Sequence, residues 1–235
     1  MKIKEMINTI VCGNCIEVMK TIPDNSVDLV VTSPPYNKKG VGGKLVKKIK
    51  YDGNTDSMDE KKYQEWQVDV LNELYRVSKM VFYNHKVRYE KEAIFPTQWI
   101  AKTKWKIWQE IVWNRSITGN IRGWRCWNID ERIYWLVKDK PSELNTKLAQ
   151  YTSIWNIRPE IKRRNHPAPF PQEIANRCLL LGSNGGDLIL DPFLGSGTTA
   201  VACKTLKRNH IGIEISPEYC QIANDRLKQT EEPMF

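Results

Sequence analysis

The sequence lacks the features that mark membrane proteins and metalloproteins. No run of about 18 apolar residues occurs in its 235 positions, so a membrane-spanning helix is not expected. It has 3 His and 6 Cys, and only Cys12 and Cys15 have Cys-x-x-Cys spacing, without a second ligand pair. We expect reduced cysteines and no metal. No apolar stretch of signal-peptide type follows Met1, so we expect a cytoplasmic protein, encoded by a prokaryote or a phage.

The length fits one α/β domain, residues 1–235, with at most a small appended lobe. The net charge of +9 favours a polyanionic partner. Much of this charge lies in two clusters, which can be solvated loops or phosphate contacts. They comprise Lys38, Lys39, Lys44, Lys47, Lys48 and Lys50, and Lys162, Arg163 and Arg164.

Strand-like and helix-like segments alternate along the chain. Short apolar runs predict buried strands at 7–12, 27–31, 80–83, 187–190 and 210–215. Amphipathic spacing predicts helices at 15–21, 59–77, 172–181 and 217–227, and one that ends near Leu206. Two aromatic segments, 105–113 and 132–137, are expected to pair, with Trp105, Trp108 and Trp135 in the core. This order predicts a doubly wound, mostly parallel sheet.

The second half carries a pattern typical of nucleoside-cofactor sites. A strand ends at Asp191, the turn Gly195-Ser196-Gly197-Thr198 follows, and the next strand ends at Glu214. Glycines allow a tight turn and a close ligand approach, and an acid about 20 residues later can bind ribose hydroxyls. No Gly-Lys-Ser/Thr follows, which excludes a phosphate-loop ATPase. An NAD site remains a rival, but Asp191 would favour a methionine ammonium over a pyrophosphate.

The first half carries Thr32-Ser33-Pro34-Pro35-Tyr36 directly after a predicted strand. The prolines remove two N–H donors and hold the flanking carbonyl groups in fixed directions. A carbonyl and the Ser33 hydroxyl could accept hydrogen bonds from an amino group, while Tyr36 stacks on a flat ring. This suits a nucleobase amine taken out of its helix. Taken alone, the same residues could be a strand-ending turn with a core aromatic.

Together the two motifs resemble those of DNA amino-methyltransferases in which Ser/Asp/Asn-Pro-Pro-Tyr precedes Phe-x-Gly-x-Gly-Thr. The resemblance covers 13–36, 113–114, 155–156, 166–167, 191–199 and 212–214. It implies a circularly permuted, Rossmann-like methyltransferase fold with an inserted DNA-recognition region. By this resemblance residues 1–113 form a catalytic half, 114–165 a target-recognition segment and 166–235 a cofactor-binding half.

The resemblance also implies residue roles. The catalytic residues would be Ser33, Pro34, Pro35 and Tyr36. S-adenosylmethionine would be bound by Asn14, Thr32, His166, Pro167, Asp191, Phe193, Gly195, Ser196, Gly197, Thr198 and Glu214. Two positions depart from the family pattern: Asn14 replaces the usual acid near the adenine, and Phe170 replaces a lysine before the last proline of its segment.

Double-stranded DNA is the expected partner, read by residues 37–58 and 114–165. These ranges combine base-edge donors with stacking surface. The predicted contacts are Lys38, Lys39, Arg115, Asn120, Arg122, Trp124 and Arg125. A separate restriction endonuclease and a second copy of this chain are further candidate partners.

The predicted reaction is methyl transfer to an exocyclic base amine. Cytosine C5 methylation needs a thiol, commonly in Pro-Cys, and the sequence has no such dipeptide. In the family that the chain resembles, Ser at the first motif position accompanies cytosine N4 and Asp accompanies adenine N6. Ser33 therefore favours cytosine N4, with adenine N6 as the alternative. An RNA or protein-amide methyltransferase and a non-catalytic nucleic-acid-binding protein are the other hypotheses.

Overall fold

The computed structural model describes residues 2–37, 58–89, 94–116, 126–140, 151–159 and 171–231. The strands are β1 Thr9–Cys12, β2 Leu29–Thr32, β3 Met80–His85, β4 Arg88–Tyr89, β5 Ile94–Phe95, β6 Lys106–Asn114, β7 Asp130–Val137, β8 Ile154–Asn156, β9 Leu188–Asp191 and β10 Asn209–Glu214. The helices are α1 Ile3–Met6, α2 Cys15–Met19, α3 Glu60–Val77, the 3₁₀ helix η1 Gln98–Lys102, α4 Gln172–Gly182, α5 Thr198–Thr205 and α6 Pro217–Gln229.

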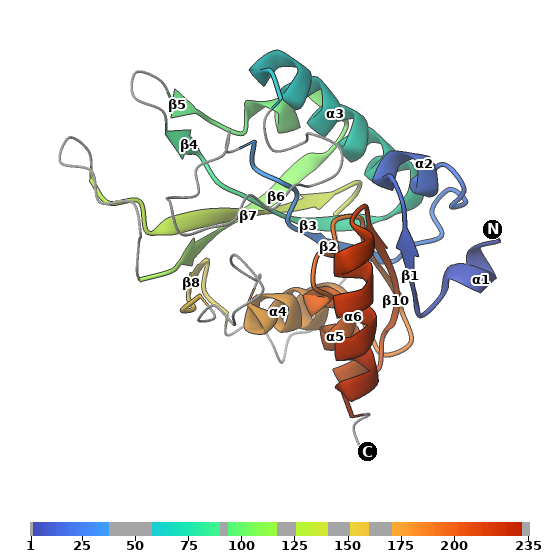
Figure 1. The fold of residues 1–235 in the computed structure, drawn as a ribbon. Coiled ribbons are helices and arrows are strands. Elements are labelled where there is room, and N and C mark those ends of the chain that lie inside the picture. Colours follow the sequence, from blue (N-terminus) through green and yellow to red (C-terminus); the bar gives the residue numbers. More distant parts are fainter. Residues whose placement is uncertain are drawn as a thin grey trace.

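Eight strands form one sheet in the order β1-β10-β9-β2-β3-β7-β6-β8 (Figure 1). The strands from β1 to β3 in this order are parallel, β7 is antiparallel to both β3 and β6, and β8 is parallel to β6. The predicted α/β fold with a doubly wound, mostly parallel sheet is confirmed, as is the pairing of the two aromatic segments.

Helices cover both faces of the sheet because neighbouring strand residues point to opposite sides. Val30 and Val81 belong to a core cluster with residues of α2, α3 and η1. Leu29, Val31 and Phe82 belong to a second cluster with residues of α4 and α5. The β2 pattern is buried throughout, which is the signature of a strand covered on both faces.

Several short elements were not predicted from the sequence. They are α1, β4, β5, η1 and β8, of which the longest has 5 residues. Such segments are too short to show a periodicity. The core prediction holds for Trp105 and Trp135 but is wrong for Trp108, which is 44% exposed. Trp108 lies in the exposed first half of β6, at an irregularity in the pairing with β7.

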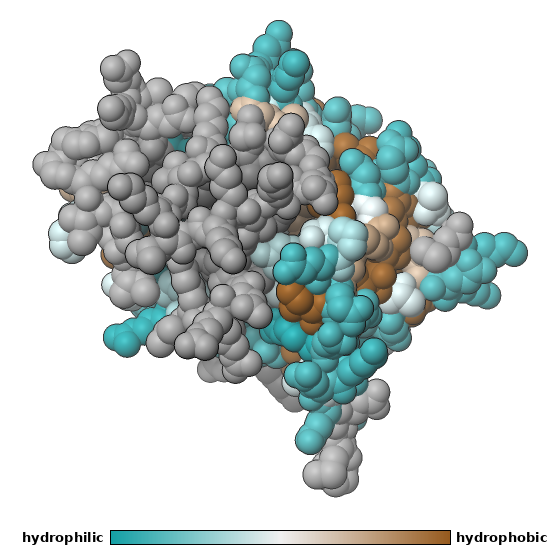
Figure 2. All heavy atoms as spheres, in the orientation of Figure 1, coloured by the Kyte–Doolittle hydropathy of each residue, from teal (hydrophilic) through white to brown (hydrophobic). Residues whose placement is uncertain are grey.

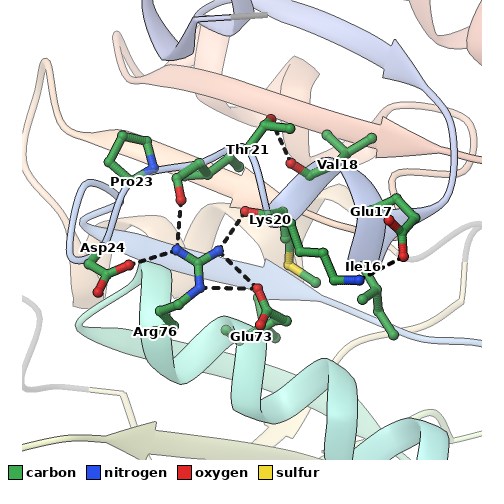
Figure 3. A network of polar contacts seen from close by, with 12 residues as sticks. Ile16, Glu17, Val18, Lys20, Thr21, Pro23, Asp24, Glu73 and Arg76 are labelled. Atoms are coloured by element: carbon green, nitrogen blue, oxygen red, sulfur yellow. Dashed lines mark hydrogen bonds and ion pairs between the residues drawn. The ribbon is translucent and has the colours of Figure 1, made fainter.

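Arg76 fastens the end of α3 to the segment that follows α2 (Figure 3). Its guanidinium donates to the main-chain carbonyls of Met19 and Ile22 at 2.7 and 2.8 Å, and to carboxylates of Glu73 and Asp24. The carbonyls at the end of a short helix need such donors. This contact holds α3 beside the turn that leads into β2, and β2 carries the chain to the proline motif.

Among the described residues, no helix has both the length and the apolar character needed to cross a membrane. All 6 cysteines are free thiols, and Cys178, Cys203 and Cys220 are buried as expected of core thiols. Within the described ranges no group of three His, Cys, Asp or Glu side chains could hold a metal ion.

Candidate active site

The carboxyl ends of the parallel strands meet at one edge of the sheet, where α/β proteins bind ligands. β9 ends at Asp191, β10 at Glu214 and β2 at Thr32. β7 runs in the opposite direction, so its first residues reach the same edge, and Glu131 lies one position from the pair His85–Arg132. The edge therefore gathers residues that are more than 100 positions apart in the sequence.

The segment Phe193–Thr198, called the glycine loop below, connects β9 to α5. Gly195 and Gly197 have φ of +55° and +90°, which residues with a side chain rarely adopt. A Cβ on Gly197 would lie 2.9 Å from the Cβ of Ala223, so α6 packs against this glycine. A Cβ on Gly195 would have nothing within 4 Å. The loop thus has one glycine for helix packing and one that faces open space.

Asp191 joins the two motifs. Its Oδ1 accepts from the Thr32 hydroxyl at 2.9 Å and from the Phe193 N–H at 3.0 Å, and its Oδ2 accepts from Thr199 at 2.6 Å. Burial raises the pKa of Asp191 to about 6. The carboxylate therefore has a structural task at the end of β9, and Thr32 connects it to β2. Its predicted contact with a methionine ammonium remains a prediction.

Glu214 supports the glycine loop from β10. Its Oε2 accepts from the Gly195 N–H at 2.8 Å and its Oε1 from the Ser216 N–H at 2.9 Å. Each carboxylate oxygen has further acceptor capacity, which suits a pair of ribose hydroxyls. The open space at Gly195 lies beside this carboxylate through their shared hydrogen bond. These features fit the adenosine part of a nucleoside cofactor.

Apolar surface accompanies these groups. Phe193 packs edge-on against Trp66 of α3, with ring centroids 5.5 Å apart. Figure 2 shows apolar side chains gathered where α2, α3 and the N-terminal end of α6 come together. A flat ring needs such surface in its binding site. Asn14, which was predicted to contact the cofactor, is exposed and caps α2 by accepting from the N–H groups of Ile16 and Glu17 at 3.0 and 3.3 Å.

The segment Ser33–Tyr36, called the proline turn below, follows β2 directly. The Ser33 hydroxyl and the Tyr36 hydroxyl lie 2.9 Å apart and are hydrogen-bonded. The Pro35 carbonyl accepts from the buried Tyr63 hydroxyl at 2.7 Å. Among the described residues, no donor reaches the Pro34 carbonyl. Ser33 and this carbonyl are thus the acceptors that the turn can offer to an amino group.

Two side chains that the sequence analysis did not single out complete the proline turn. Asn84 of β3 donates from Nδ2 toward the Tyr36 hydroxyl at 2.6 Å and toward Ser33 Oγ and Glu131 Oε2 at 3.2 Å each. Glu131 accepts from the Tyr36 hydroxyl at 3.0 Å. Burial and the negative charge of Glu131 raise the pKa of the Tyr36 hydroxyl well above its usual value. Tyr36 therefore stays protonated at neutral pH.

Arg115 and the predicted DNA contacts have different standings. Arg115 Nη1 lies 3.2 Å from Glu131 Oε1, and its guanidinium lies 5.7 Å from the centroid of the Trp113 ring. It is thus part of the site, and its contact with DNA remains a prediction. The other predicted DNA contacts and two predicted cofactor contacts lie outside the described residues. These are Lys38, Lys39, Asn120, Arg122, Trp124, Arg125, His166 and Pro167.

Comparison with known proteins identifies the family. The sequence profile of the DNA methylase family that comprises N6 and N4 enzymes matches residues 27–225. The chain belongs to this family. It is 30% identical to the Type II methyltransferase M.HpaI of Haemophilus parainfluenzae over 250 positions, which cover 93% of this chain and 73% of the relative. With M.HinfI of Haemophilus influenzae the identity is 29%, covering 97% of this methylase and 70% of the relative.

Solved structures agree with this methylase fold. A DNA modification methylase of Thermus thermophilus, solved with S-adenosyl-L-methionine, superposes with a TM-score of 0.71 at 25% identity and covers 97% of both chains. The cytosine-N4-specific PvuII DNA methyltransferase superposes with a TM-score of 0.75 at 17% identity, covering 95% of this chain and 93% of that one, a likeness of fold alone. The predicted resemblance to DNA amino-methyltransferases is confirmed.

A second layer of buried polar groups supports the proline turn of the methylase from below. The Tyr63 hydroxyl, besides its bond to Pro35, lies 2.7 Å from His85 Nε2 and accepts from Gln67 at 2.8 Å. The Tyr36 ring packs against the His85 ring, with centroids 4.7 Å apart. In the sequence only the helical spacing of Tyr63 was visible. Its contact with the turn follows from the position of α3 over β2 and β3.

Proposed function

We propose that this DNA methyltransferase methylates the N4 amine of cytosine, with S-adenosylmethionine as methyl donor. The observation that carries the proposal is the neutral hydroxyl of Ser33 at the acceptor position of the proline turn. In a family that acts on both base amines, Ser at this position favours cytosine N4. The open space at Gly195 beside Glu214 supports the choice of an adenosine-containing donor.

The side chains of the edge can each be given a task. S-adenosylmethionine, when bound, supplies an electrophilic methyl group. Ser33 Oγ and the Pro34 carbonyl accept hydrogen bonds from the base amine, which draws its lone pair out of conjugation with the ring. The Tyr36 ring stacks on the base that has left the helix. Catalysis then depends on positioning and electrostatics, without a covalent nucleophile.

The remaining roles concern the cofactor and the DNA. We propose that Glu214 binds the ribose, that Asp191, Phe193 and the glycine loop surround the rest of the donor, and that Asn14 lies near the adenine. The lysines and arginines predicted from the sequence would bind the phosphates. Because M.HpaI and M.HinfI are Type II methyltransferases, we also propose a cytoplasmic role beside a separate endonuclease.

Base analysis tests the proposal. Duplex DNA is methylated with labelled donor, digested to nucleosides and examined by mass spectrometry. N4-methylcytosine is the expected product, and a product that contains only N6-methyladenine would overturn the cytosine assignment. Ser33→Ala should lower the rate about 100-fold while the donor affinity stays unchanged, because only the acceptor for the amine is lost. RNA and protein substrates measured in parallel serve as controls.

A further inference from the structure

Every methylation of a base amine leaves a proton to be removed. One N–H bond is replaced by an N–CH₃ bond, and the donor loses its positive charge as its S–CH₃ bond breaks. We propose that the proton leaves through Ser33 and Tyr36 to the carboxylate of Glu131, which is the proton acceptor of this enzyme. The proposal rests on the proposed amine methylation, and it holds for either base because each amine loses the same proton.

The oxygens form a continuous chain of hydrogen bonds. Ser33 Oγ lies 2.9 Å from the Tyr36 hydroxyl, which lies 3.0 Å from Glu131 Oε2. Both distances are within the range in which a proton passes between oxygens. The chain begins at the group that would touch the amine and ends at a carboxylate. Three hops of one proton each leave Ser33 and Tyr36 with their original proton counts and convert Glu131 to its acid form.

Asn84 gives this chain a direction. Its Nδ2 carries only donors, so its short contact of 2.6 Å uses a lone pair of the Tyr36 oxygen. Glu131 is acceptor-only when ionised, so the Tyr36 hydroxyl proton points to it. The Ser33 hydroxyl then donates to Tyr36, and a lone pair of Ser33 remains for the amine. The same geometry fixes the Asn84 amide, because its oxygen facing Glu131 would place two acceptors together.

Charge and burial favour Glu131 as the final acceptor. Glu131 is 6% exposed, and Arg115 Nη1 lies 3.2 Å from its other oxygen, which favours the ionised form before the reaction. When the donor loses its positive charge and Glu131 gains a proton, the buried site undergoes no net change of charge. Removing a full charge from such a site would otherwise be costly. Arg115 is about a quarter exposed and connects Glu131 to the surface.

Other ionisable groups near the chain must be considered in any pH measurement. From β3 and the residue after it, the His85 ring packs on Tyr36 and Lys86 Nζ lies 5.7 Å from the centroid of the same ring. From the end of β6, Arg115 pairs with Glu131. On β7, Asp130 and Arg132 pair with each other. Among these groups and Glu131, only Glu131 accepts a hydrogen bond from Tyr36.

The test compares Glu131→Gln and Tyr36→Phe with Glu110→Gln, a matched control. Glu110 lies on the neighbouring strand β6 and pairs with Arg132 outside the chain of oxygens. Single-turnover methyl transfer to duplex DNA is measured between about pH 5 and 9 at saturating donor. Glu131→Gln and Tyr36→Phe should each be about 100-fold slower, with unchanged donor affinity, and the control should match the wild type.

The pH profile separates a proton acceptor from a structural residue. The wild-type rate should fall at low pH as Glu131 becomes protonated, and the Glu131→Gln profile should lack this decline. A Glu131→Gln rate within threefold of the wild type, or a reduced rate with an unchanged pH profile, would overturn the proposal. If the wild type methylates only adenine N6, the cytosine assignment fails, but the rate ratios and profiles still test the proton route.

A readout without donor or DNA tests the hydrogen bond itself. Melting temperatures of Tyr36→Phe, Glu131→Gln and the double variant form a double-mutant cycle. If the bond exists, the loss in the double variant is smaller than the sum of the two single losses. Additive losses would contradict the bond on which the route depends. Because Tyr36→Phe keeps the ring against His85, a large loss of packing is not expected from this variant.

Discussion

The glycine loop and the proline turn meet at the same edge of the sheet, but they are held in place in different ways. The glycine loop is held through its own backbone: Gly195 donates to Glu214, and Phe193 donates to Asp191. The proline turn has no backbone donors at its prolines and is held by side chains from other elements. Asn84, Glu131 and Tyr63 all come from at least 27 positions away.

This difference separates local from distant encoding. A loop that binds through its backbone needs glycines at fixed spacing, and such a pattern is visible in the sequence. A turn that is held by distant side chains depends on strand order and register, which no short motif records. Predictions that perturb each region in turn can therefore sharpen or break the contrast.

The largest effect is expected in the glycine loop. Gly197→Ala should lower the free energy of unfolding by roughly 4 kcal/mol, because it combines a strained φ with a clash against Ala223. Gly186→Ala is the control, since Gly186 has a φ of +87° but open space around its Cβ. It should cost only about 1 kcal/mol. Equal losses in urea unfolding would show that packing against α6 contributes nothing.

Asp191 should couple the glycine loop to pH. Its folded pKa of about 6 lies above its unfolded value, so its stabilising contribution is full below about pH 4 and is lost as the pH rises through about 6. Relative to Asp191→Asn, the wild type should therefore lose about 3 kcal/mol between about pH 4 and pH 7. Urea unfolding of both proteins at several pH values measures this. A difference that does not vary with pH would contradict the raised pKa.

The proline turn should respond to the loss of a single distant hydroxyl. Tyr63→Phe leaves the Pro35 carbonyl without this donor and should cost about 2 kcal/mol, as well as slowing methyl transfer. Tyr75→Phe, on the same helix, is the control, since no hydrogen bond of its hydroxyl is found among the described residues. Thermal unfolding and single-turnover rates would show whether the support acts on stability, on the rate or on both.

The smallest effect is expected at Asn14, where a capping role and a proposed cofactor role coincide. Asn14→Ala should cost about 1 kcal/mol, because two N–H groups of α2 lose their acceptor. Asn14→Asp keeps the cap and should retain the stability. Donor affinity measured for both variants then isolates the cofactor role. If affinity follows stability across the two variants, Asn14 acts through α2 alone.

The sequence predicted the parts of this molecule that have a strong local pattern. The sheet, its principal helices and the two motifs followed from apolar runs and from fixed residue spacing. Asn84 and Glu131 did not, because each lies within a strand and becomes part of the site only through the register of β3 with β7. Arg115 was predicted as a DNA contact from its composition-rich surroundings, and its ion pair with Glu131 depends on the same register.

The pairing of β1 with β10 has a consequence for how the protein is made. Thr9 aligns with Ile211, so a strand formed early in synthesis must wait for one translated about 200 residues later. Until then the β10 side of the sheet has no edge strand, and Glu214 has not emerged from the ribosome. Contacts of such high contact order form late in folding. A nascent chain should therefore not bind the methyl donor, and activity should begin only after the two ends of the sheet have closed.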